Sequence, residues 1–104
     1  MKSATYQTTA IVLLLLLTIL PGCGYPEVSP TTYEIAGALY SVSNLKREDG
    51  LANVETLISE SLQAQEISSR EAGYLIEIVQ QCRAGDWETA QAECRRMMDD
   101  QIDR

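Results

Sequence analysis

Few residues of this chain have side chains that could carry out catalysis or hold a metal ion. The sequence contains three cysteines, no histidine, and 15 Asp and Glu residues. Without histidine, the usual general base and the commonest metal ligand are missing. Neighbouring carboxylates such as Glu48 and Asp49, or Asp99 and Asp100, would point about 100° apart on a helix and would not act on one atom. We therefore expect no enzyme, no cofactor and no metal site.

Two of the three cysteines, Cys82 and Cys94, fall in stretches with helical periodicity. In an antiparallel hairpin that turns at Gly85 and Asp86, their heights along the helices would differ by about 7 Å at 1.5 Å per residue. That offset is beyond easy disulfide geometry. Because both lie on apolar faces, we expect buried free thiols. The alternative is a disulfide between two molecules.

The third cysteine directly follows an apolar segment near the amino terminus. Residues 10–20 read AIVLLLLLTIL, and as a helix they would span about 16 Å, roughly half of the hydrocarbon core of a bilayer. That length is typical of a secretory signal peptide and short for a membrane-spanning helix. The following sequence, Leu20-Pro21-Gly22-Cys23, resembles the lipobox of bacterial lipoproteins, with Leu at −3, a small residue at −1 and Cys at +1.

The lipobox resemblance implies that residues 1–22 form a signal peptide, which is cleaved between Gly22 and Cys23. It also implies that Cys23 carries a diacylglyceryl group and a further fatty acid such as palmitate on its new amino terminus. Two or three acyl chains give a stable anchor, at about 0.8 kcal/mol per buried methylene. The expected location is the cell envelope, on the periplasmic side or in the outer membrane.

Two alternatives to lipid anchoring remain open. Gly22 and Gly24 could serve as the −3 and −1 residues of an ordinary signal peptidase site, which would release a secreted soluble protein that begins at Tyr25. The apolar segment could also stay uncleaved as a short membrane anchor.

Residues 23–30 are predicted to be a lipidated cysteine and a flexible tether. Residues 24–30 read GYPEVSP and contain two of the three prolines of the chain, which favour extended backbone. Such a tether would hold the domain about 20 Å from its anchor at roughly 3.1 Å per residue. Residues 31–104 then form an acidic helical domain.

Apolar residues in this domain recur with the spacing of amphipathic helices. Four helices are predicted, at about 31–45, 51–65, 69–84 and 87–102. The positions expected to face the core are Ala36, Leu39, Tyr40 and Ser43, with Ile35 and Val42 beside them; Leu51, Val54, Leu57, Ile58 and Leu62; Ala72, Leu75, Ile76, Val79 and Cys82; and Trp87, Ala90, Cys94, Met97 and Met98.

Several local signals mark the helix ends. Residues 31–34 (TTYE) and 68–71 (SSRE) have the pattern of a capping box. Residues 46–50 (KREDG) predict a charged turn, Gly85 a left-handed helix stop, and Asp86 the cap of the last helix.

The predicted fold is all-α, with two antiparallel hairpins arranged as a small bundle or as a solenoid. Residues 85–90, GDWETA, resemble the turn and second-helix start of a tetratricopeptide repeat. That resemblance implies stacked hairpins with a peptide-binding groove. Helical periodicity alone can also make two hairpins align, so coincidence is the alternative.

The net charge and the aromatic and methionine residues of the chain limit the classes of partner that it can bind. A net charge of −7 argues against binding to nucleic acid or anionic headgroups by the domain. Aromatic and methionine side chains are frequent in binding surfaces, so the candidate interaction residues are Tyr40, Tyr74, Trp87, Met97 and Met98, with core packing as the alternative. The predicted function is a membrane-anchored envelope lipoprotein that acts as a non-enzymatic protein-binding or adaptor module. A structural lipoprotein or spacer is the alternative.

Overall fold

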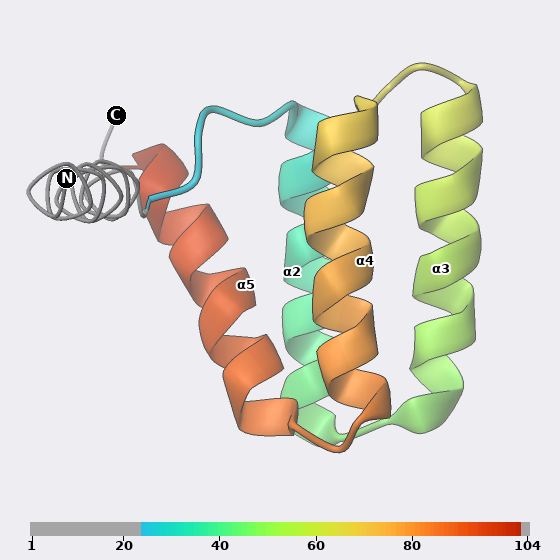
Figure 1. Cartoon of the computed structure of the whole chain (residues 1–104), viewed down its shortest axis with the longest axis vertical. Coiled ribbons are helices and arrows are strands. Elements are labelled where there is room, and N and C mark those ends of the chain that lie inside the picture. Colours follow the sequence, from blue (N-terminus) through green and yellow to red (C-terminus); the bar gives the residue numbers. More distant parts are fainter. Residues whose placement is uncertain (1–23, 103–104) are drawn as a thin grey trace, which may run out of the picture.

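The structure, a computed structural model, describes residues 24–102, which form four α-helices joined by short turns (Figure 1). Helix α2 spans Pro30–Leu45, α3 spans Glu48–Gln63, α4 spans Ser69–Arg83 and α5 spans Trp87–Ile102. No strand occurs among these residues. The predicted all-α fold is confirmed, and each helix lies close to its predicted bounds.

Helices α2 and α4 form the centre of the bundle, because each packs against the other three helices. Helices α3 and α5 lie on opposite sides and do not touch (Figure 1). The most extensive interface joins α2 to α5, the first and last helices described. The chain therefore forms a compact four-helix bundle.

The helix ends show which local signals operate. The predicted capping box at residues 68–71 is confirmed, since the Glu71 amide donates to Ser68 Oγ at 3.1 Å and the Ser68 amide donates to Glu71 Oε1 at 2.7 Å. Gly85 has φ +85° and stops α4 as predicted. The prediction of a capping box at residues 31–34 is wrong, because Ser29 caps α2 by accepting from the Thr32 amide. Pro30 enters the first turn because its fixed φ and missing N–H suit that position.

The turn between α2 and α3 is shorter than predicted. Lys46 adopts a left-handed conformation with φ 53°, and α3 already begins at Glu48. Glu48 and Asp49 therefore lie in the first turn of α3, where their charge complements the helix dipole. Gly50 lies in the same turn, and a Cβ there would come within 2.9 Å of Val42 Cγ2.

Two of the three glycines inside the described helices, Gly50 and Gly73, should respond differently to a methyl group. A Cβ on Gly73 in α4 would meet nothing within 4 Å, so Gly73→Ala should stabilise the protein by about 0.5–1 kcal/mol. Gly50→Ala should gain less or lose stability, because Val42 must shift. Urea unfolding of the two variants measures this difference, and an equal gain would contradict the close packing of α2 against α3.

The buried core draws on all four helices. The buried apolar residues are Ile35, Ala36, Leu39, Leu51, Val54, Ile58, Ile67, Ala72, Leu75, Ile78, Val79, Cys82, Ala90, Cys94 and Met97. The prediction of burial is wrong for three residues, since the exposed fractions of Leu57, Leu62 and Ile76 are 41%, 37% and 43%. Helix α3 sits at the flank and touches only α2 and α4, so the edges of its apolar stripe stay uncovered. On α4, Ile78 is buried where Ile76 was expected.

Candidate functional site

The predicted anchor lies outside the residues that the structure describes. Gly24 is the first described residue. It follows the predicted signal peptide (residues 1–22), the predicted cleavage site between Gly22 and Cys23, and the predicted lipidation residue Cys23. What the structure describes is the path of the chain immediately after that site. We call residues 24–29 the N-terminal strap.

The N-terminal strap lies against the last turns of α5 (Figure 1). The Tyr25 amide donates to Asp100 Oδ2 at 2.6 Å, and the Val28 amide donates to Gln101 Oε1 at 3.0 Å. Gln101 also donates from Nε2 to the Pro26 carbonyl at 2.9 Å. Two side chains of α5 therefore satisfy three backbone groups of an otherwise extended segment.

Tyr25 provides the aromatic contact of the strap. Its ring meets the ring of Tyr74 in α4 edge to face, with centroids 5.3 Å apart and an interplanar angle of 82°. Its hydroxyl donates to Glu93 Oε1 at 2.5 Å. Burial, together with the hydrogen bond to Glu93 and its negative charge, raises the pKa of Tyr25 above its ordinary value. The hydroxyl therefore stays protonated and remains a donor.

Glu71 joins the strap to the start of α4. One carboxylate oxygen accepts from the Ser68 amide within the capping box, and the other accepts from the Ser29 amide at 2.5 Å. Burial raises the pKa of Glu71, but the hydrogen bonds from Ser29 and Ser68 outweigh it and the net pKa is lowered. One carboxylate thus caps α4 and also holds the residue that caps α2.

The prediction of a flexible tether that holds the domain at a distance is wrong for the strap, since residues 25–29 bind to the domain itself. Proline does keep this segment out of a helix, but the remaining backbone groups find partners on α4 and α5. Sequence reasoning missed Glu93, Asp100 and Gln101 because they lie 68 to 75 positions from their strap partners. No local spacing signals such a contact.

The five candidate interaction residues differ in burial. Met97 is fully buried, so core packing applies to it. Tyr74 is occupied by the ring of Tyr25. Tyr40, Trp87 and Met98 are partly buried against the core.

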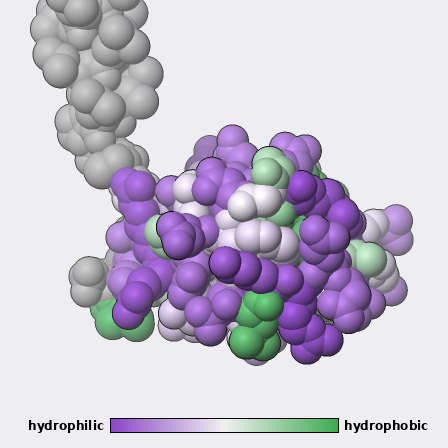
Figure 2. Space-filling model, turned by 90° about the horizontal axis from the view of Figure 1, so that it is seen from below, coloured by the Kyte–Doolittle hydropathy of each residue, from purple (hydrophilic) through white to green (hydrophobic). Residues whose placement is uncertain are grey.

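Exposed apolar side chains adjoin one another instead between α3 and α4. We call this surface the α3–α4 groove. It encloses about 280 Å³ and is lined by Glu55, Ile58, Ser59, Leu62 and Ile76. By contrast, the face of the molecule seen in Figure 2 is mostly hydrophilic.

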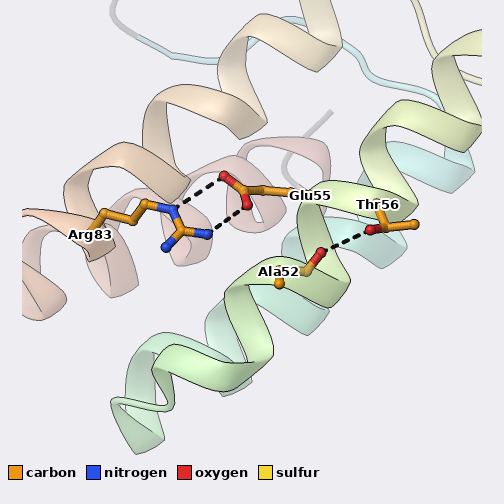
Figure 3. A network of polar contacts seen from close by, with 4 residues as sticks. All are labelled: Ala52, Glu55, Thr56 and Arg83. Atoms are coloured by element: carbon orange, nitrogen blue, oxygen red, sulfur yellow. Dashed lines mark hydrogen bonds and ion pairs between the residues drawn. The ribbon is translucent and has the colours of Figure 1, made fainter.

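An ion pair crosses from α3 to α4 beside this groove (Figure 3). Arg83 donates from Nη2 to Glu55 Oε1 at 2.6 Å and from Nε to Oε2 at 3.3 Å. Thr56 lies next to it and donates to the Ala52 carbonyl within α3. Both charged side chains are nearly half exposed, so water screens the pair and it contributes little to stability.

Cys82 and Cys94 are buried free thiols, as predicted. Burial raises the pKa of Cys82. Burial, followed by the proximity of Cys82 and Glu93, raises the pKa of Cys94 to about 12. Because the thiolate is the reactive form, neither residue acts as a nucleophile at neutral pH.

Within residues 24–102, every helix is too short or too polar to span a bilayer. No group of three or more His, Cys, Asp or Glu side chains there is arranged to hold a metal ion. Comparison of the chain with protein-family models, with curated proteins and with solved structures finds no significant match.

Proposed function

We propose that this protein is a bacterial envelope lipoprotein, anchored by fatty acids on Cys23, whose helical domain binds another protein at the membrane surface. The observation that carries the proposal is the sequence Leu20-Pro21-Gly22-Cys23 directly after the apolar run of residues 10–20. An apolar segment of that length suits a cleaved signal, and acyl chains then provide the anchor.

The described structure is compatible with lipid at that position. Gly24, the neighbour of Cys23, is exposed, so acyl chains on the preceding residue can leave the domain without displacing its core. The fold itself begins only with the strap contacts of Tyr25. Lipid attachment and folding therefore do not compete for the same residues.

The lipid anchor is tested by intact mass. Protein expressed in a bacterium should have the mass of residues 23–104 plus the acyl chains, and it should partition into detergent. Cys23→Ser should lose the whole lipid mass, because serine has no thiol to alkylate. Cys82→Ser is the matched control and should keep it. A mature form that begins at Tyr25, or a mass that shows Cys23 unmodified, would contradict the anchor.

The binding role is supported by the α3–α4 groove. Leu62 and Ile76 are large apolar side chains that remain accessible there beside Ile58. Apolar side chains that adjoin at a surface favour contact with a polypeptide over a purely spacing role. The mostly hydrophilic face in Figure 2 favours the second candidate, a structural spacer.

Photo-crosslinking in the producing cells distinguishes these two roles. A photoreactive residue in place of Ile76 should give a discrete protein adduct, because that side chain opens into the groove. The same residue in place of Ser41, which is exposed on α2, is the control and should give none. No adduct at either position, or equal adducts at both, would favour the spacer.

A further inference from the structure

The N-terminal strap brings the attachment point of the lipid to one end of the bundle. A Cβ on Gly24 would lie 3.3 Å from Asp100 Oδ2, so Gly24 sits directly beside the last turns of α5. Cys23 is bonded directly to Gly24 in the sequence, so acyl chains on Cys23 would be attached next to the carboxyl end of α5.

The strap is held at several points along its length. Asp100 and Gln101 bind its backbone from α5, Glu93 binds the Tyr25 hydroxyl, and Glu71 of α4 binds its last residue. The edge-to-face contact with Tyr74 adds an apolar component. A segment fixed to two helices transmits the position of its anchor to the whole bundle.

The bundle has two distinct ends, which Figure 1 shows at its top and bottom. The strap end contains the strap, the beginnings of α2 and α4, and the carboxyl ends of α3 and α5. The turn end contains the α2–α3 and α4–α5 turns, with Lys46, Arg47 and Trp87. A helix of 16 residues separates the ends by about 24 Å.

From this geometry we infer that the strap end faces the lipid bilayer and the turn end faces away from it. The inference rests on the proposed lipid anchor and goes beyond it, because it assigns the membrane-facing surface of the domain. Because the strap is docked on the domain, it does not act as a flexible linker of about 20 Å that would let the domain reorient freely. Lys46, Arg47 and Trp87 are then presented outward.

The inferred orientation depends on the docked strap and not on charge. Glu27, Glu66 and Asp99 lie at the strap end, so anionic headgroups repel that end. The turn end contains the cations Lys46 and Arg47 but also Glu48 and Asp49.

The test uses the full-length lipidated protein in vesicles of phosphatidylcholine and phosphatidylglycerol that contain a headgroup-linked fluorescence quencher. Trp87 is the only tryptophan of the chain, so its fluorescence reports the turn end. A Trp87→Phe, Glu66→Trp variant reports the strap end. We expect severalfold stronger quenching of the probe at position 66 than of Trp87. Equal quenching of the two in vesicle-bound protein overturns the inference and leaves the lipid anchor standing.

A strap-release variant provides the second readout. Tyr25→Ser with Gln101→Ala removes the aromatic contact and three of the hydrogen bonds between the strap and α5, and its helical circular dichroism checks the fold. Release should make quenching of the two probes similar. An unchanged difference would overturn the role of the strap. If the wild-type protein isolated from the bacterium carries no lipid and does not float with the vesicles, both the inference and the proposed function are overturned.

Discussion

Leu39→Ala is expected to lower the free energy of unfolding by about 2–5 kcal/mol. Leu39 is fully buried in α2, which, like α4, packs against all three other helices. Truncation removes buried methyl groups and leaves a cavity in the centre of the bundle. Small domains have total stabilities of roughly 5–15 kcal/mol, so a large part of the stability of this one would be lost. Chemical unfolding followed by far-ultraviolet circular dichroism measures the loss.

Leu57→Ala is the matched control for Leu39→Ala. Both leucines lie within helices, and both were expected in the core from periodicity, but Leu57 is 41% exposed on α3. Its truncation should cost less than about 1 kcal/mol. Equal losses for the two variants would contradict the placement of α3 at the flank of the bundle.

Glu71→Ala is expected to cost about 1–3 kcal/mol, because two backbone amides lose their charged acceptor. Those amides belong to Ser68 and Ser29. Glu71→Gln should cost less, since an amide side chain keeps one acceptor oxygen for Ser68 while its NH₂ cannot accept from Ser29. Hydrogen exchange at the Ser29 amide should accelerate in both variants. Glu77→Ala, on the exposed face of α4, is the control and should leave that amide protected.

The same carboxylate makes stability depend on pH. Hydrogen bonds outweigh burial and lower the folded-state pKa of Glu71 below its ordinary value. Its contribution is therefore fully present above the ordinary carboxyl pKa and is lost as the pH falls through the lowered folded-state pKa. We expect the advantage of the wild type over Glu71→Gln to shrink between about pH 6 and pH 3. An advantage that stays constant over this range would contradict the role of Glu71 as a charged acceptor.

The helices of this protein follow from local chemistry. Hydrophobic periodicity, the Ser68–Glu71 capping box and the glycine stop at Gly85 each involve residues a few positions apart. Such interactions are encoded within one or two turns of chain, so they can be read without knowledge of the fold. The buried free thiols Cys82 and Cys94 followed from the same periodicity.

Tertiary packing decided which side of each apolar stripe is covered and where the amino-terminal segment lies. Ile78 is buried and Ile76 exposed because α4 has neighbours on some sides only. Tyr25 contacts Glu93 and Asp100 across 68 and 75 positions of sequence. Contacts of that separation exist only once the helices are assembled, since the acceptors on α5 meet the strap only when α5 has docked on α2. Composition alone therefore suggested a free tether, where the folded chain has a bound strap.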